Sequence, residues 1–398
     1  MVIYIGKKNL NDRHIDNLLY VFLMPLIIDL ISVIVRQFGL GNSSAITMLI
    51  YVISIVFMLG RVHPFYVKDI IVLFLVYGIF LFNYVWFEGT RAYMFDSEMI
   101  VVYLFFFPVC ILSIQHINDW DLFWEKMVKF SIVAVGISTF IMLFLDYASF
   151  LVYMGFSYAL LPFIACLYSE GRKNKNIFYI VLFAIGSIEI LAFGARSVVL
   201  FIVIYIYVFE LLRSDTSFQM KAIGIGGLSA VTLIVIANFN RIINLISGFS
   251  IFKGSYFLKM LTTGRITESK SRKLIYESCI QRIQTMGLDV TGFFGDRQFC
   301  KGYAYPHNIV YEILMSWGWI IGGIFLTFLL VLIVKSVLLK EKNLRDISLL
   351  MLITGFSRFV ISGSYVNEGR FWVLLFVVIA LIKTNKENIR KAVYSDEI

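Results

Sequence analysis

Charged side chains are scarce in this sequence. Only 15% of its 398 residues are Asp, Glu, Lys or Arg, whereas about a quarter are charged in an average soluble domain. Hydrophobic residues make up 60% of the chain and gather in runs near the length that crosses about 30 Å of hydrocarbon. These runs do not alternate between apolar and polar positions, which excludes a membrane β-barrel. The composition therefore excludes a soluble globular protein and predicts an all-α polytopic membrane protein.

Motifs for the common cofactors are missing as well. The sequence has no P-loop, no GxGxxG, no HExxH and no paired CxxC, which removes the usual nucleotide and zinc sites. It has no internal repeat of the kind that builds inverted-repeat transporters. The polar stretch Asn9–Asn17 precedes an apolar run long enough to remain in the membrane, so we expect no cleaved signal peptide. We predict neither a metal ion nor a cofactor.

The apolar runs predict about twelve membrane-spanning helices in a single integral membrane domain, residues 1–398. Ten or eleven spans remain open, because the linker at 147–149 is very short. The predicted spans are 18–35, 44–60, 69–87, 99–115, 128–146, 150–168, 176–193, 197–212, 221–239, 309–334, 346–362 and 370–383.

Basic residues set the predicted orientation. With the N-terminus inside, the inner segments carry twenty Lys and Arg, and the short outer segments carry four. Because positively charged segments stay in the cytoplasm, we expect both termini there. The long interval 240–306 exceeds the length over which this rule counts charges. With both termini inside, the interval lies outside, which in a bacterial cell is the periplasm. The expected location is the inner (cytoplasmic) membrane.

The interval 240–306 is the one long polar stretch of the chain. It holds ten Lys and Arg but only four acidic residues. The difference of +6 is most of the net charge of +9. A basic loop at a bilayer surface attracts anions. Arg265 and Arg272 lie in a segment with the spacing of an amphipathic helix, and Gly292–Arg297 has the composition of a turn that presents Arg297. We predict a large loop with short helices that binds an anion, although each single arginine is alternatively a solvated surface charge.

The four cysteines fall into two pairs. Cys110 and Cys166 lie in apolar spans and are expected to be small core residues. Cys279 and Cys300 lie in the long loop, and they could form a disulfide if that loop faces an oxidising compartment. Their spacing has no signature of its own.

Four charged residues fall inside or at the ends of apolar spans, where charge is costly. They are Asp29, Glu189, Arg196 and Arg358. Arg196 is expected at the outer rim, where its guanidinium suits recognition of phosphate; the alternative is an arginine that reaches to lipid headgroups. Glu189 lies seven residues earlier on the same helical face and could orient Arg196 or simply pair with a neighbour. We assign no role to Asp29.

His307 is the only histidine expected on the outer side. It lies where the loop re-enters the membrane, and Asn308 is the expected N-cap of the following helix. A helix N-terminus disfavours imidazolium, so a neutral His307 could accept a proton from an alcohol. Glu312 could orient the ring or the acceptor. The alternatives are an ordinary interfacial cap for His307 and a solvated first-turn acid for Glu312.

Several short motifs, in their order along the chain, resemble those of O-antigen polymerases. They are Gly194-Ala195-Arg196-Ser197, Arg265 and Arg272 ahead of Gly292–Arg297, Pro306–Glu312 followed by Trp317-Gly318 and Gly322-Gly323, and Ser362–Tyr365 with Phe371-Trp372. The chain thus resembles the O-antigen polymerase and ligase superfamily of bacterial envelope glycosyltransferases. The likeness in topology covers the whole chain, and the motifs concentrate between 194 and 323.

This resemblance implies a metal-independent transfer of oligosaccharide carried on undecaprenyl pyrophosphate, as in lipopolysaccharide biosynthesis. It implies that Arg196, Arg265 and Arg272 bind the pyrophosphate, with the key loop arginine left open between the last two. It also implies that His307 deprotonates the acceptor hydroxyl, which attacks the anomeric carbon with inversion. The residues expected to contact substrate are Arg297, Asn308, Tyr311 and Glu312.

The implied partners are a lipid-linked oligosaccharide donor and acceptor, membrane lipid and a chain-length regulator protein, with no nucleic acid. The nearest alternative is an O-antigen ligase, which transfers the glycan to lipid A-core. A flippase for lipid-linked glycans is the alternative from another class. A flippase needs charged residues along a path through the membrane, whereas the charges here gather on one face.

Overall fold

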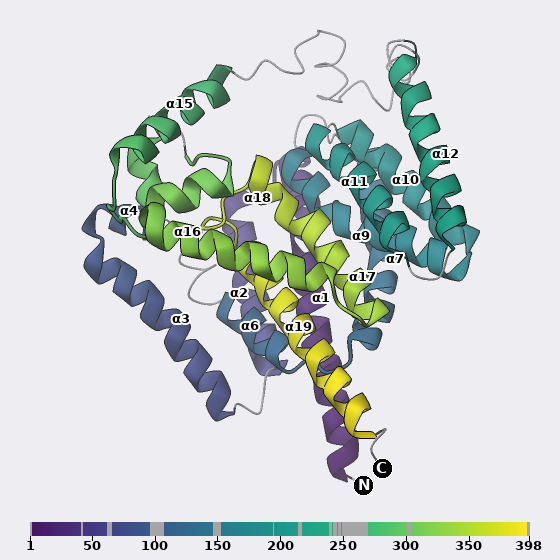
Figure 1. The fold of residues 1–398 in the computed structure, drawn as a ribbon, viewed down its shortest axis with the longest axis horizontal. Helices are drawn as coiled ribbons and strands as arrows, with labels where there is room; N and C mark the ends of the chain where they lie inside the picture. Colours follow the sequence, from purple (N-terminus) through teal and green to yellow (C-terminus); the bar gives the residue numbers. More distant parts are fainter. Residues whose placement is uncertain are drawn as a thin grey trace.

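The computed structural model describes residues 2–40, 43–61, 66–95, 107–145, 153–193, 195–213, 217–238, 270–300 and 304–395, with Arg241, Leu245 and Gly248 as single positions. Every regular element in these ranges is a helix (Figure 1). The elements are α1 (Val2–Gln37), α2 (Ser43–Arg61), α3 (Val67–Trp86), η1 (Glu88–Thr90), α4 (Arg91–Met94), α6 (Phe107–Gln115), α7 (Trp120–Phe144), α9 (Tyr153–Asn174), α10 (Ile177–Phe193), α11 (Arg196–Leu212), α12 (Phe218–Ala237), α15 (Lys270–Thr285), η4 (Gly295–Phe299), α16 (Ile309–Val337), α17 (Lys342–Met351), the π-helical turn η5 (Leu352–Phe356), α18 (Ser357–Ile361) and α19 (Gly369–Ser395).

The predicted all-α class is confirmed for the described ranges, and a helix overlaps each of the twelve predicted intervals. Four stretches are long and apolar enough to cross a membrane by length and composition: Asn11–Gln37, Val67–Trp86, Trp120–Phe144 and Ile309–Val337. The second of these, α3, turns most of its apolar side chains outward, with Phe74 77% exposed. An apolar outer surface of this kind is suited to lipid and unsuited to water.

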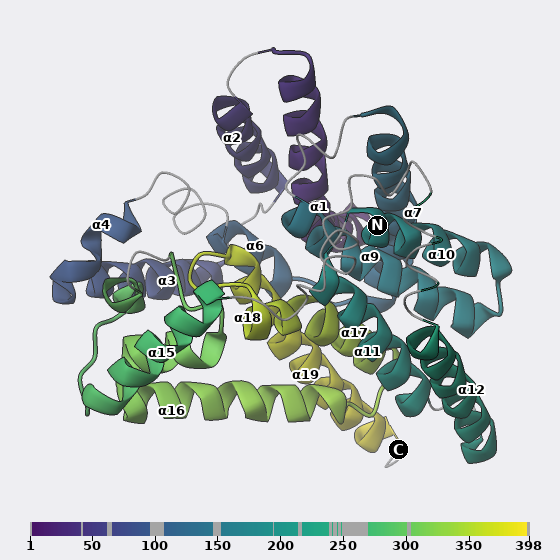
Figure 2. The ribbon, with the colours of Figure 1, turned by 90° about the horizontal axis from the view of Figure 1, so that it is seen from above.

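The middle of the molecule is a helical bundle around α1. Helices α2, α6, α7 and α9 pack against α1, and α10 packs on both α7 and α9. Helix α19 packs against α6, α16 and α17. Two helices lie at opposite edges of the molecule, α3 on one side and α12 on the other (Figures 1 and 2). The bundle thus provides a rigid support for the segments that connect its helices.

Helix α16 is broken at Gly318, although the sequence predicted one continuous span from 309 to 334. Gly318 has φ 70° and ψ −179°, a combination open essentially to glycine alone. A Cβ atom there would lie 2.9 Å from the carbonyl oxygen of Asp289. The break leaves the carbonyl of Ser316 without its helical partner, and the backbone N–H groups of Thr291 and Gly292 donate to it at 2.9 and 3.0 Å. The incoming loop therefore completes the helix at its break.

The described part of the long loop, 270–300, contains α15 and η4, in keeping with the predicted short helices. Gly292 has φ 76°, and a Cβ atom there would collide with Phe87 and Asn83 at the end of α3. The side chain of Asn83 accepts a hydrogen bond from the N–H of Phe293 at 2.7 Å. The loop is thus fastened on one side to α16 and on the other to α3.

Candidate functional site

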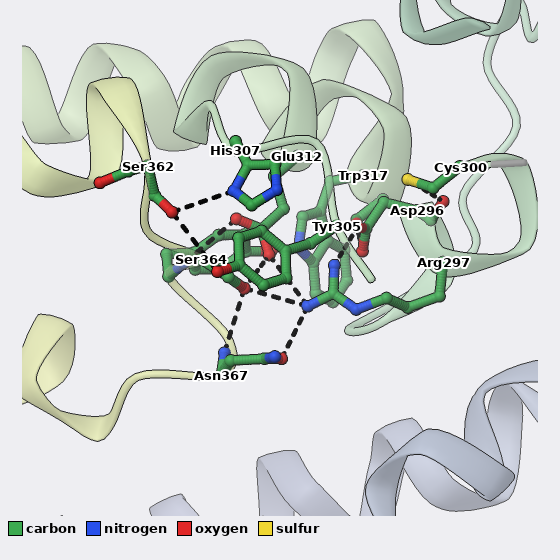
Figure 3. A network of polar contacts seen from close by, with 12 residues as sticks. Asp296, Arg297, Cys300, Tyr305, His307, Glu312, Trp317, Ser362, Ser364 and Asn367 are labelled. Carbon is green, nitrogen blue, oxygen red and sulfur yellow. Dashed lines mark hydrogen bonds and ion pairs between the residues drawn. The ribbon is translucent and has the colours of Figure 1, made fainter. Parts of the chain in front are cut away.

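Two segments meet beside the first turn of α16. One is the stretch from η4 to Asn308, which leads into α16, and the other is the connection 362–368 between α18 and α19 (Figure 3). The sequence separation between them is more than 50 residues. They are held together by a buried network of polar side chains with Arg297 at its centre.

Arg297 is enclosed by the protein. Its side chain is 6% exposed, and its guanidinium pairs with Asp296 and with Glu312, the latter at 3.3 Å. The same group donates to the side-chain oxygen of Asn367 at 2.7 Å and to the hydroxyl of Ser364 at 3.0 Å (Figure 3). The turn that carries Arg297 was expected to present it to an anion, but four internal partners already occupy the guanidinium. Its position is therefore that of an organising cation.

Glu312 fixes the connection between α18 and α19. It is fully buried, and it accepts hydrogen bonds from the hydroxyl of Ser364 and from the N–H of Tyr365, the latter at 3.1 Å. With Asp296 and Arg297 it forms a set of two carboxylates and one guanidinium. Burial raises the pKa of Asp296, and the neighbouring guanidinium opposes this rise. Because two buried carboxyl groups share one guanidinium, one of the two carboxyl groups is expected to keep its proton.

His307 is held in one tautomer. Its Nδ1 lies 3.1 Å from the carbonyl oxygen of Ser362, and because a carbonyl only accepts, Nδ1 must carry the hydrogen. The ring of Tyr305 lies against the imidazole with 4.3 Å between ring centres. The backbone of His307 is in the left-handed region, with φ 57°, a conformation that costs a non-glycine residue free energy and clusters at functional sites.

Burial lowers the pKa of His307, and the positive charges of Arg272 and Arg297 lower it further, while the bond to Ser362 opposes the shift. This shift favours the neutral ring, in which Nε2 carries no hydrogen. A neutral imidazole of fixed orientation is the arrangement that a general base requires.

Ser362 connects this site to the start of α11. Its hydroxyl donates to the phenolic oxygen of Tyr158 at 2.9 Å, and that oxygen lies 2.6 Å from the hydroxyl of Ser197. The adjacent residue, Arg196, is the first residue of α11 and is half-buried. A cation at a helix N-terminus opposes the helix dipole, so this position does not stabilise the helix and calls for another role.

A second arginine lies next to this link. The guanidinium of Arg358 lies over the ring of Tyr158 at 4.7 Å and pairs with Glu368 at 3.0 Å. Together with Arg370, these three residues line a small pocket between α9, α18 and α19. Tyr158, which accepts from the Ser362 hydroxyl, therefore also contacts an arginine.

The structure brings most of the predicted loop residues together. Asn308 is the N-cap of α16, as expected, and its side chain accepts from the N–H groups of Val310 and Tyr311 at 2.9 and 3.3 Å. The ring of Tyr311 packs against Tyr276 of α15, with 5.2 Å between ring centres. Arg272, also on α15, is half-buried and close enough for its charge to act on His307. Arg265 lies outside the described residues.

Two predicted orienting roles are different in the structure. Glu189 was expected either to orient Arg196 or to pair with a neighbour; one of its oxygens accepts from Thr139 of α7, and the other has no hydrogen-bond partner within the described ranges. Glu312 was expected to orient His307 or the acceptor, or to be a solvated acid. It is buried, and it reaches His307 only indirectly, through the connection that supplies the Ser362 carbonyl.

The sequence had predicted no role for Ser364, Asn367 or Tyr158, although Ser364 lies within the motif Ser362–Tyr365. The available signal was the short polar run 362–368 between two apolar helices, which contains two serines, a glutamate and an asparagine. As for metal ions, the described ranges hold no group of three or more His, Cys, Asp and Glu side chains placed to bind one.

No protein-family model matches this chain, and no curated protein matches it either.

Proposed function

We propose that this chain is an O-antigen polymerase. In this proposal it joins oligosaccharide repeat units carried on undecaprenyl pyrophosphate at the periplasmic face of the inner membrane. Each reaction moves the growing glycan from one lipid carrier to the sugar end of the next lipid-linked unit, and it releases undecaprenyl pyrophosphate.

The observation that carries the proposal is the state of His307. Its tautomer is fixed by the carbonyl of Ser362, and burial with the nearby charges of Arg272 and Arg297 lowers its pKa, which favours the neutral ring. Glycosyl transfer to a hydroxyl needs a base for the acceptor and positive charge for the leaving pyrophosphate. In the proposal His307 meets the first need, and Arg272, whose charge acts on His307, meets the second.

The proposed reaction is an inverting transfer of the glycan to a hydroxyl group. The acceptor hydroxyl gives its proton to Nε2 of His307, its oxygen bonds to the anomeric carbon of the donor, and the bond from that carbon to the pyrophosphate oxygen breaks. The configuration at the anomeric carbon inverts. Arg272 and Arg196 neutralise the charge that develops on the leaving pyrophosphate, and a well-placed donor of this kind contributes about 10²–10³ in rate.

Arg297 and Glu312 have a supporting part in this proposal. Their partners are internal, so they hold η4, the first turn of α16 and the 362–368 connection in register. His307 then keeps its orientation because Ser362 cannot move away. Binding of the acceptor by Arg297 itself is not part of the proposed mechanism.

The arrangement of the molecule supports the proposed orientation. Helix α15 lies at one end of the molecule, and the beginning of α1 and the end of α19 lie at the other (Figure 1). This separation fits a loop outside the cell membrane and both termini inside, as the distribution of basic residues predicts.

Reconstitution tests the proposal. Purified protein in liposomes that contain the cognate lipid-linked repeat unit should produce a ladder of longer lipid-linked glycans, with release of undecaprenyl pyrophosphate. Transfer only to added lipid A-core would indicate a ligase instead. Movement of the repeat unit across the bilayer without extension would indicate a flippase, and either of these outcomes refutes the polymerase.

A further inference from the structure

Two cysteines from different parts of the long loop meet in the structure. Cys279 lies on α15, Cys300 directly follows η4, and both side chains are fully buried. Both are free thiols in the structure, and Cys279 lies close enough to Cys300 to raise the pKa of its thiol. Around them is a small apolar cluster, separate from the main core, formed by Ile275, Ile283, Met286, Leu314 and Met315.

We propose that Cys279 and Cys300 form an intramolecular disulfide in the mature protein. An S–S bond is about 2 Å long, and the two cysteines share one small apolar cluster, so the bond forms when their side chains turn toward each other. The bond would link α15 to η4 across a loop in which no other covalent connection exists within the described residues. It is a modification site of the extracytoplasmic loop and does not involve Cys110 or Cys166, which lie on α6 and α9.

The oxidation needs a disulfide reagent on that side of the membrane, either a dithiol-oxidising exchange protein or a low-molecular-weight disulfide. One thiol attacks the oxidant to give a mixed disulfide, and the second thiol then attacks the sulfur bound to the first. Two S–H bonds and the S–S bond of the oxidant break, and one S–S bond forms between Cys279 and Cys300. The oxidant takes up both hydrogens and both electrons and leaves as two thiols.

The bond has to form before the loop has finished folding. The neighbouring Cys279 and the burial of Cys300 raise the pKa of the Cys300 thiol. Because the thiolate is the attacking species, a buried thiol of this kind reacts slowly. Oxidation during folding gives a bond that is then enclosed and protected.

The disulfide would connect two parts of the proposed site, because each cysteine lies near one of its arginines. Arg272 lies seven residues before Cys279, two turns along the same face of α15. On the other side, the Cys300 thiol donates to the carbonyl oxygen of Asp296 at 3.2 Å, next to Arg297. The bond therefore fixes the distance between the arginine proposed to bind pyrophosphate and the network that holds His307. This part of the inference rests on the proposed function and on its placement of the loop outside the cytoplasm.

Counting free thiols tests the disulfide directly. Cells are quenched in acid, the full-length protein is denatured, and its thiols are labelled with a polyethylene glycol maleimide. The chain has four cysteines, so we expect two adducts before reduction and four after it. Four adducts before reduction would overturn the proposal, whether or not the protein extends glycans.

Matched variants identify the partners. The double variant Cys110→Ser/Cys166→Ser should give no adduct before reduction and two after it, and two adducts before reduction would overturn the pairing. Cys279→Ser should give three adducts in both conditions. Because the count is made on denatured protein, it does not depend on activity, and a failure of glycan extension in liposomes would leave it unchanged.

Discussion

The Nδ1 atom of His307 lies 3.1 Å from the carbonyl oxygen of Ser362, a residue 55 positions further along the chain. The same carbonyl accepts from the hydroxyl of Tyr305 at 3.4 Å. One backbone oxygen thus receives hydrogen bonds from two neighbouring rings and determines how the imidazole is turned. The position of that oxygen depends in turn on Glu312, which binds the N–H of Tyr365.

Replacing His307 separates its structural role from its proposed chemical role. Asparagine retains a side-chain N–H that can donate to Ser362 but has no basic nitrogen, whereas alanine has neither. We expect both His307→Asn and His307→Ala to lose glycan extension by about 10²–10⁴-fold, with the thermal midpoint of the asparagine variant unchanged. Extension in liposomes and thermal unfolding in detergent measure the two effects. Normal extension by His307→Asn would remove the base from the mechanism.

The pH dependence of glycan extension should reflect the ionisation of His307. Burial and nearby arginines lower the pKa of His307 from its ordinary value of about 6.5, so the active neutral form persists to a lower pH. Activity is present above the pKa of the folded protein and is lost as pH falls through it. We therefore expect the acid limb of the kcat/KM profile below about 6.5.

Arg272→Gln gives a control for this profile. The substitution removes one of the positive charges that depress the pKa of His307, so the acid limb should move to higher pH, toward the ordinary value. The overall rate should fall as well, because Arg272 is proposed to bind pyrophosphate, but the midpoint of the limb is independent of that loss. A midpoint that does not move would show that the limb belongs to another group.

Substitution of Arg297 tests the stability of the buried polar network rather than the proposed chemical step. Arg297→Met leaves the carboxylates of Asp296 and Glu312 buried without their cation, and breaking a buried pair in this way costs about 3–5 kcal/mol. We expect the free energy of unfolding in detergent to fall by this amount. The triple variant Arg297→Met/Asp296→Asn/Glu312→Gln replaces all three ionisable groups by neutral ones and should recover much of the loss. A stable Arg297→Met protein that has lost only its activity would instead indicate direct binding of substrate.

Much of the site could be predicted because it is encoded locally. The N-cap at Asn308 is local, because its side-chain oxygen accepts from the N–H groups of the residues two and three positions later in the chain. The place of His307 follows from the point at which the polar loop gives way to an apolar helix. Both require only neighbouring residues, and both are visible in the sequence.

The burial of Arg297 could not be predicted in the same way. Its partners Glu312, Ser364 and Asn367 lie 15, 67 and 70 residues away, and only tertiary packing brings them to it. A turn rich in glycine and charge therefore had the composition of an exposed loop although its arginine is enclosed. The break in α16 was missed for a related reason, because a glycine in an apolar run is tolerated in a helix and only the approach of Asp289 shows its purpose.

Gly318 should be the least replaceable glycine of α16. Its φ of 70° and ψ of −179° are not open to alanine, and the added Cβ would lie 2.9 Å from the carbonyl oxygen of Asp289. We expect Gly318→Ala to lower the free energy of unfolding by about 1–3 kcal/mol, or to straighten α16 and release Thr291 and Gly292 from Ser316. Glycan extension should fall with it, since the loop that carries Arg297 is fastened at this point.

A second glycine of the same helix provides the control. At Gly323 a Cβ atom would meet nothing within 4 Å, and alanine in a helix interior is favoured over glycine by about 0.5–1 kcal/mol. Gly323→Ala should therefore leave stability equal or slightly higher and extension unchanged. Thermal unfolding of the two variants side by side decides the matter. If Gly318→Ala behaved as Gly323→Ala does, the break in α16 would not be what holds the loop in place.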